Sequence, residues 1–252
     1  MKRPRLITRR RALVTGLASA GGFFLTRNLG TLPPTYGHLL RLGDNLTYAA
    51  HRVLLPGQSL VKEYSRGAIS SFPAIGTTSP ADLAKPELSH AYGRLQKTTF
   101  TDWRLSVEGL VSSPGTYSLA DLKRFPSRTQ ITRHTCEEGW SAIAEWTGVP
   151  LRNVLEAAGI LPAARFVSYY SYDDWTDSID MLDALHPQTL LAYGMNGRDL
   201  SVPHGAPVRL RVETQLGYKS LKFLKGIVVR EEFDDGGAKG NIQNGWSWYA
   251  GI

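Results

Sequence analysis

The chain has 252 residues, of which 42% are hydrophobic and 10% aromatic, an ordinary composition for a globular protein with a buried core. Its formal net charge of +7 arises at the N-terminus, because residues 1–27 hold seven basic side chains and no acidic one, and the remainder is formally neutral. No basic run interleaved with aromatic residues follows position 27, so we expect no nucleic-acid partner.

Residues 1–30 are typical of an export signal. Thr8 and the bases Arg9 to Arg11 precede an apolar run of 14 residues at 12–25, whereas a spanning helix needs about 20. The paired arginines match the twin-arginine pattern, which predicts the twin-arginine export machinery as a partner. This route carries folded proteins, so it also suggests a cofactor inserted before export. The alternative is a solvated basic tail ahead of a buried helix.

No clear A-x-A cleavage site follows the apolar run. We therefore expect a periplasmic protein, either soluble or held at the inner membrane by an uncleaved N-terminal segment. Residues 31–97 are rich in Pro, Gly and Ser, and they are predicted to form an irregular arm with a loop-like stretch at 70–76.

From residue 98 the pattern changes to strands and short helices. Trp103, Leu105 and Val107 alternate with polar residues, as in a half-buried strand. Ser118 is predicted to cap a helix at 119–125. Further strands are expected at 130–136, 165–172, 208–212 and 222–229.

Two local signals in the second half of the chain are stronger. An apolar stripe with helical spacing is stopped by Gly159 and consists of Leu151, Val154, Leu155 and Ala158. The pair Asn196-Gly197 predicts a hairpin between 190–195 and 199–202. Many strands with few short helices predict one α+β domain over 98–252. No Gly-rich phosphate loop of the nicotinamide or nucleoside triphosphate type is recognised.

The single cysteine, Cys136, lies where a predicted strand ends. One cysteine excludes an internal disulfide, a CxxC zinc site and the CxxCH attachment of a c-type haem. A lone cysteine is more often a small buried hydrophobe than a ligand. His134, two residues earlier, leaves open a Cys/His nucleophile pair, although no third residue or oxyanion motif accompanies it.

A series of motifs in fixed order surrounds this cysteine. It comprises Arg133-His134-Thr135-Cys136-Glu137-Glu138-Gly139-Trp140-Ser141, Trp146-x-Gly148-Val149-Pro150-Leu151, His186-Pro187, Leu190 to Gly197, and His204-Gly205-Ala206-Pro207-Val208-Arg209-Leu210. The series resembles the molybdopterin-binding domain of the sulfite oxidase family, which includes the periplasmic methionine-sulfoxide reductases, over roughly residues 65–252. The resemblance implies the sulfite oxidase fold, a single molybdopterin-binding domain of mostly β scaffold with short helices, with cofactor contacts beginning near residue 65.

Carried over residue by residue, the resemblance implies that Cys136 is the catalytic thiolate ligand to one molybdenum atom. It implies contacts to the molybdopterin from His204, Arg209 and Lys222, of which the arginine suits the phosphate. Taken singly, each of these three could be a turn or surface residue. Further predicted cofactor contacts are Ser70, Phe72, Ser171, Ser220 and Leu221. In the loop that contains Ser70, the reductases carry Asn, Tyr and Glu where this chain has Ser70, Pro73 and Ala74.

The activity implied by the resemblance is two-electron oxygen-atom transfer at molybdenum, in which the cofactor carries the chemistry. The oxygen-atom donor or acceptor is a small molecule or a protein-bound group. Because the chain has no haem motif, the electrons are expected to be exchanged with a separate cytochrome or haem membrane subunit.

Two departures from the family pattern leave open whether the substrate is a sulfoxide or sulfite. Sulfite oxidases place arginines where this chain has Trp140 and Ser141, whereas His204 is the residue of the sulfite oxidases and not of the reductases, which have Asn. Two other functions compete with this one. The chain could be a metal-free binding module of the same fold, or a hydrolase that uses Cys136 and His134.

Overall fold

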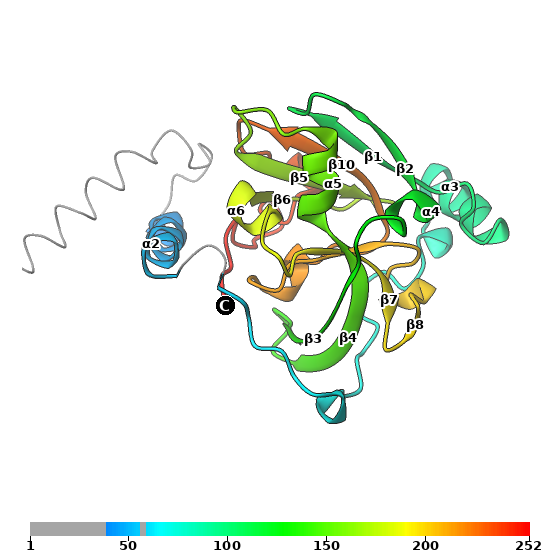
Figure 1. Cartoon of the computed structure of the whole chain (residues 1–252), viewed down its shortest axis with the longest axis horizontal. Helices are drawn as coiled ribbons and strands as arrows, with labels where there is room; N and C mark the ends of the chain where they lie inside the picture. Colours follow the sequence, from blue (N-terminus) through cyan, green and yellow to red (C-terminus); the bar gives the residue numbers. More distant parts are fainter. Residues whose placement is uncertain (1–38, 56–58) are drawn as a thin grey trace, which may run out of the picture.

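The computed structural model describes residues 39–55 and 59–252, so the predicted export signal lies outside the described residues. Two sheets form the body of the molecule (Figure 1). The first has the strand order β2 (Gly115–Ser118), β1 (Arg104–Gly109), β10 (Leu224–Arg230), β5 (Phe166–Ser171), β6 (Thr176–Asp180). The pair β1–β10 is parallel and the other pairs are antiparallel.

The second sheet has the order β3 (Arg128–Thr135), β4 (Ser141–Pro150), β7 (Leu190–Met195), β8 (Arg198–Asp199), and β9 (Arg209–Arg211) also pairs with β7. The helices are α2 (Leu39–Leu54), α3 (Pro86–Lys97), α4 (Leu119–Leu122), α5 (Leu151–Ala158) and α6 (Met181–Ala184). The predicted α+β class and sulfite-oxidase-like fold are confirmed by these two sheets and by the structural comparison reported below.

The largest apolar cluster in the described chain joins both sheets and α5. Trp103, directly before β1, and Leu105 of β1 are fully buried with Leu191 of β7 and Leu151 of α5. The predicted helical stripe of α5 therefore faces this core, and Gly159 ends the helix with a φ of 77°, a value that glycine adopts without strain. The shared core fixes the two sheets against each other, and so the loops between them.

The predicted hairpin is confirmed, with Asn196 and Gly197 at φ 52° and 75° between β7 and β8. The helix after Ser118 is shorter than predicted, since α4 ends at Leu122, but its cap is confirmed: Ser118 and Asp121 form a capping box. The strands β2, β4 and β6 were not predicted. Every residue of β6 is buried although several are polar, so it lacks the alternation that marks a strand in sequence.

The prediction of an irregular arm over 31–97 was wrong where α2 and α3 form. Pro86 occupies the first turn of α3, where a missing N–H costs nothing, so proline here begins a helix instead of breaking one. No helix in the described part of the chain is both long enough and apolar enough to cross a membrane.

A buried ion pair fastens the short turn at Gly217–Lys219 to β6. Lys219 is fully buried, and its Nζ donates to Asp177 at 2.6 Å and to the carbonyl of Ser178 at 3.0 Å. Asp177 also accepts from Asn241 at 2.6 Å. This pair holds the segment that begins at Gly217, which lines the cavity described next.

We predict that Lys219→Met destabilises the protein by about 3–5 kcal/mol, because it leaves the Asp177 carboxylate buried without its cation. Lys123→Met is the control, since the side chain of Lys123 is 42% exposed and its ion pair is superficial, so its removal should cost less than about 0.5 kcal/mol. Urea unfolding of both variants measures the difference. Equal free energies of unfolding for the two variants would contradict a stabilising role of the ion pair between Lys219 and Asp177.

Candidate functional site

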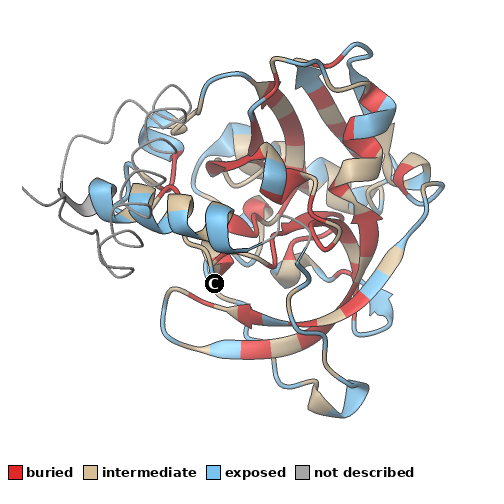
Figure 2. Cartoon of the chain, turned by 60° about the vertical axis from the view of Figure 1, so that its left-hand side comes forward, coloured by how far each residue is buried: buried red, intermediate tan, exposed pale blue. Residues whose placement is uncertain are grey.

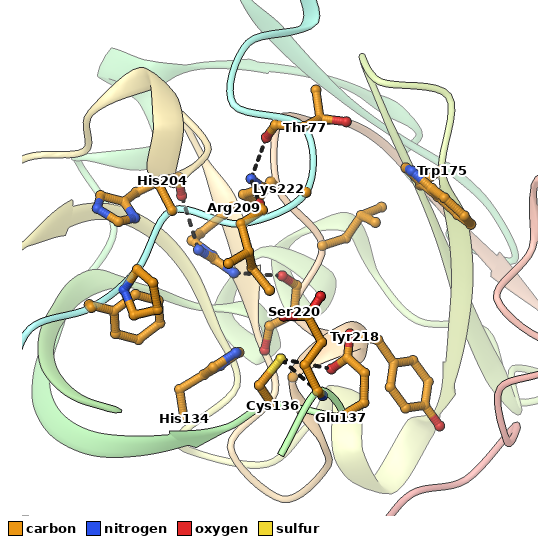
Figure 3. Close-up of a pocket in the computed structure, with 18 of the residues that line it drawn as sticks. Thr77, His134, Cys136, Glu137, Trp175, His204, Arg209, Tyr218, Ser220 and Lys222 are labelled. Atoms are coloured by element: carbon orange, nitrogen blue, oxygen red, sulfur yellow. Dashed lines mark hydrogen bonds between the residues drawn. The ribbon is translucent and has the colours of Figure 1, made fainter. Parts of the chain in front are cut away.

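A cavity of about 310 Å³ lies where the loop after β3 meets the segments 72–77, 203–204 and 217–222. Figure 3 shows Cys136 and Glu137 at one end of it and Lys222 with Thr77 at the other. Among the residues predicted from sequence, the cavity is lined by Cys136, Phe72, His204, Arg209, Ser220, Leu221 and Lys222. The fold therefore brings together residues that are up to 150 positions apart in the chain.

Cys136 follows the last residue of β3 and is held in a tight turn. Its N–H donates to the carbonyl of Trp140 at 2.9 Å, and its own carbonyl accepts from Gly139 at 3.1 Å. The positive φ of Gly139, 89°, allows the chain to turn directly beneath the sulfur. This geometry presents Sγ to the cavity at the end of a rigid strand.

The free thiol of Cys136 is not activated by its own protein neighbours. Burial, assisted by Glu137 and Glu138, raises its pKa to about 11. Sγ lies 3.5 Å from Glu137 Oε2 and 3.5 Å from the N–H of Glu138. A nearby metal cation is the kind of neighbour that removes the proton from such a thiol, because a coordinated thiol is deprotonated outright.

Arg209 is a buried cation without an anionic partner in direct contact. Its two terminal nitrogens donate to the carbonyls of His204 at 3.0 Å and Ser220 at 2.8 Å, while Nε is buried and has no hydrogen-bond partner among the described residues. Burial and the charge of Arg211 lower its pKa to about 9. The folded chain thus disfavours this charge unless an anion joins it.

Lys222 and His204 extend the same positive region. Lys222 Nζ donates to the carbonyls of Ile75 at 2.7 Å, Pro203 at 3.2 Å and Thr77. Burial, followed by the charge of Arg209, lowers the pKa of Lys222 to about 8. The pKa of His204 is lowered by burial and by the charges of Arg209 and Lys222. Carbonyl oxygens fix these side chains, but they do not neutralise them.

The residues present fit a molybdopterin. An anionic phosphate would supply the counter-charge that Arg209 lacks, and the buried Nε of Arg209 is an unused donor. The nearby Asp173 only partly offsets the charge of Lys222, whose pKa stays lowered. A soft thiolate at Cys136 suits a soft metal whose other ligands come from its own cofactor. No group of three or more His, Cys, Asp or Glu side chains able to hold a metal occurs among residues 39–55 and 59–252.

Phe72 is the aromatic centre of one wall. Its ring lies 5.1 Å from the ring of His134, 5.7 Å from His204 and 5.4 Å from Trp146. Trp146 in turn stacks beneath two cations, with Arg209 Cζ 5.2 Å and Arg211 Cζ 4.4 Å from the ring centre. Phe72 thus forms part of the cavity wall, and its predicted contact to the cofactor stays a prediction.

Two predicted cofactor contacts lie outside this cavity. The Ser70 hydroxyl accepts from the N–H of Ile143 at 3.0 Å, and Ser70 lines a separate cavity beside Met195. The Ser171 hydroxyl is used inside the β5–β6 turn, where it bonds to Asp173 and to the N–H of Trp175 at 3.0 Å. Neither hydroxyl is directed by the structure toward Cys136, and both contacts stay predictions.

Ser220 and Leu221 both line the cavity. The Ser220 carbonyl binds Arg209, and its hydroxyl accepts from the N–H of Val212 at 3.0 Å. Sequence reasoning missed several lining residues, namely Asp173, Trp175, Tyr218, Asn241 and Trp246. Of these residues, only Trp246 had a signal in the sequence. It stands in a Gly-rich tail, where a core residue is not expected.

The arrangement does not support the Cys/His hydrolase. Arg211 Nη1 lies 2.7 Å from His134 Nδ1, and burial with the charges of Arg211 and Arg209 lowers the pKa of His134 to about 2. A histidine with this pKa cannot take a proton from a thiol whose pKa is raised.

The comparisons with known proteins agree with this site. A family model described as the oxidoreductase molybdopterin binding domain matches residues 92–237. A putative protein-methionine-sulfoxide reductase subunit, YedZ1, of Azospira oryzae is 40% identical over 172 residues, which cover 67% of this chain and 64% of that protein. The catalytic subunit MsrP of Ralstonia nicotianae is 36% identical over 149 residues, which cover 53% of this chain and 44% of that protein.

Among solved structures, the sulfane dehydrogenase SoxCD from Paracoccus pantotrophus superposes with a TM-score of 0.51 and 26% sequence identity. The match covers 54% of this chain and 40% of that chain. The chain therefore spans about half to two thirds of the length of the curated relatives named above.

We predict that Arg209→Met lowers the molybdopterin content of the purified protein. Removing the buried cation takes the charged partner from the phosphate, at a cost of about 2–5 kcal/mol. Arg198→Met is the control, because Arg198 is exposed in β8. Extraction and quantification of the pterin measures both variants. Unchanged content in Arg209→Met would contradict the assignment of the phosphate to Arg209.

A second prediction concerns pH. Without its anion Lys222 has a pKa of about 8, and a bound phosphate raises that pKa, so above pH 8 binding requires uptake of a proton. Cofactor retention should therefore be constant below about pH 8 and fall as the pH rises further. Lys222→Arg, which stays charged, should flatten this profile. Equal losses from both proteins at about pH 9.5 would exclude Lys222 as the titrating group.

Proposed function

Because the chain belongs to the oxidoreductase molybdopterin-binding domain family, within the sulfite oxidase family of molybdopterin enzymes, we propose that it reduces sulfoxides outside the cytoplasm. The observation that carries this proposal is the cavity that places Cys136 with the buried cations Arg209 and Lys222 among aromatic walls. The relatives named as methionine-sulfoxide reductase subunits support the same reaction.

When bound, molybdopterin supplies a metal that exchanges an oxygen atom and two electrons with the substrate. The chain orients the cofactor and supplies the charged groups that bind it. Cys136 gives the thiolate at the end of β3, Arg209 and Lys222 hold the phosphate, and Phe72 excludes water from one wall. Overall, a sulfoxide, two electrons and two protons give a thioether and water.

The substrate is proposed to be neutral and partly apolar, as the side chain of oxidised methionine is. At the position of a sulfite-oxidase arginine, Trp140 donates its indole N–H to Glu138 at 3.1 Å and packs against Phe72. Trp175 and Trp246, which are 36% and 37% exposed, line the cavity and can contact a thioether. Sulfite, a dianion, would meet Glu137 and Glu138 beside Cys136 instead of a free cation.

Electrons are proposed to come from a separate cytochrome or haem membrane subunit. This proposal is supported by the absence of a haem attachment motif in the sequence and by its lone cysteine. We place the protein in the periplasm, exported by the twin-arginine machinery, on the strength of Arg9 to Arg11 and the apolar run that follows them.

The decisive assay uses a reduced dye as electron donor for two sulfoxide substrates and an oxidised dye as electron acceptor for sulfite. We expect turnover with free methionine sulfoxide and with an oxidised methionine-rich protein, and none in the oxidative direction with sulfite. Turnover of sulfite alone would overturn the choice of substrate, while leaving the molybdenum site in place.

Cys136→Ser should abolish this turnover, because a hydroxyl is a harder and far less acidic ligand than a thiol. Wild-type protein should contain about one molybdenum per chain, as expected for one thiolate ligand. Elemental analysis and the dye-linked assay measure the two quantities. Full activity in the Ser variant would rule out Cys136 as the ligand.

Replacement of Arg9 and Arg10 by Lys tests the export route. The double variant keeps the charge but loses the guanidinium groups of the twin-arginine motif, so it should remain in the cytoplasm, folded and loaded with cofactor. Cell fractionation with blotting follows the protein, and the pterin assay follows its loading. Normal export of this variant would contradict the twin-arginine interpretation.

A further inference from the structure

Helix α2 packs on the body with its polar side. Tyr48 donates to Asp180 at 2.9 Å, and Arg52 makes ion pairs with Asp180 at 2.9 Å and Asp183 at 2.7 Å. Asn45 accepts from the indole N–H of Trp248 at 3.0 Å. The ring of Tyr48 also lies 4.8 Å from that of Trp248. These contacts fix the rotation of the helix about its axis.

The outward side of α2 is apolar. The exposed residues among its described side chains are Leu42, Gly43, Leu46, Thr47, Ala50, Val53 and Leu54. None of them is charged, and the Thr47 hydroxyl donates to the carbonyl of Gly43 at 2.9 Å. In Figure 2 this helix lies across the side of the body near the C-terminus, with its outer surface drawn as exposed.

Three of these residues form a continuous line, which we name the α2 stripe: Leu42, Leu46 and Val53. They are 54%, 48% and 57% exposed, and spacings of four and seven residues put them on one side of the helix. The helices of globular proteins ordinarily bury such a line in the core. Here the polar side is buried instead, so the orientation of α2 is the reverse of the usual one.

Exposed apolar side chains are concentrated in this region. Six of the eleven large apolar side chains that are exposed in the described chain lie between positions 42 and 60. An exposed arginine, Arg165, lies beside α2, because it lines the same small cavity as Tyr48. Contiguous apolar surface with cations at its edge is typical of a surface that binds a membrane.

We propose that the α2 stripe lies in the interface of an anionic phospholipid bilayer and orients the protein on the membrane. This inference rests on the proposed location in the periplasm. It adds that a folded helix, and not only the N-terminal apolar run, makes the contact. The ligand is the lipid surface itself, which receives Leu42, Leu46 and Val53 at the boundary between headgroups and acyl chains.

The sequence ahead of α2 favours a bilayer as the occupant. Thirteen residues, 26–38, separate the apolar run 12–25 from Leu39, and a chain of that length spans at most about 45 Å when fully extended. If the run inserts, α2 cannot leave the neighbourhood of the bilayer. Of the basic residues within 1–27, Arg27 lies between the run and α2 in the sequence, and a cation there is attracted to anionic lipids.

A second copy of the chain is a poorer occupant. Sixteen residues of helix are about 24 Å long, and a stripe about 10 Å wide on it offers about 240 Å². A stable dimer buries about 800 Å² on each partner. Insertion into lipid has no such threshold, because its strength grows with each apolar side chain that enters.

The test separates the stripe from the apolar run. The full chain carrying Leu17→Asp and Phe24→Asp, which break the run, serves as the parent and is mixed with vesicles of equal parts phosphatidylcholine and phosphatidylglycerol. We expect the parent to float with the vesicles and the addition of Leu46→Asn and Val53→Asn to lower the bound fraction about tenfold. Adding Leu161→Asn instead, at an exposed apolar residue outside α2, should change nothing.

Equal flotation of the parent and the double Asn variant, or no flotation of the parent, would overturn the proposal, as would a change from dimer to monomer in sedimentation. The dye-linked sulfoxide assay should be the same for all these proteins, so that failure of the stripe and failure of the proposed reaction remain distinguishable. If the double Asn variant misfolds, an environment-sensitive dye on Leu46→Cys replaces it. Its emission should shift to the blue on vesicles, whereas the same dye on Leu161→Cys should not respond.

Discussion

The structure depends on a buried positive charge that the chain does not neutralise. Arg209 is held by two carbonyl oxygens, its Nε has no partner within the described residues, and burial and the charge of Arg211 disfavour its own charge. Arg211 is compensated by Glu213 at 2.8 Å, but Arg209 has no such carboxylate. Folding therefore prepares a site that is complete only with an anion, and the free energy of phosphate binding offsets the cost of burying these cations.

The two ends of the cavity differ in the charge of the residues that line them. At the end of Lys222, two cations held by carbonyl oxygens, Lys222 and Arg209, outnumber the carboxylate of Asp173, which leaves a positive charge that suits a phosphate. At the end of Cys136 the neighbours are Glu137, Glu138 and aromatic rings, which suits a thiolate-bound metal and a neutral substrate. One cofactor that carries both a phosphate and a soft metal satisfies both ends, which neither the hydrolase nor the metal-free module does.

Sequence predicted what local patterns and the family resemblance encode. The Asn196-Gly197 turn, the α5 stripe and the strand end at Cys136 all follow from short-range rules. Strand β6 was missed because its polar residues are buried by distant partners, as Asp177 is by Lys219. Ser171 could not be placed from sequence, because only the fold shows that its hydroxyl serves the β5–β6 turn. The inward polar face of α2 was equally hidden, since an amphipathic pattern does not say which side meets the body.

The C-terminal tail connects the two surfaces on which the proposals rest. Trp246 lines the cavity and stacks on Tyr218 at 5.4 Å, while Trp248, two residues later, packs on Tyr48 of α2. Two residues of extended chain cover at most about 7 Å, so the inner side of α2 lies a short distance from the cavity mouth. A protein that rests on a bilayer through the α2 stripe would keep its redox centre close to the membrane plane. That position suits an electron partner embedded in the same bilayer.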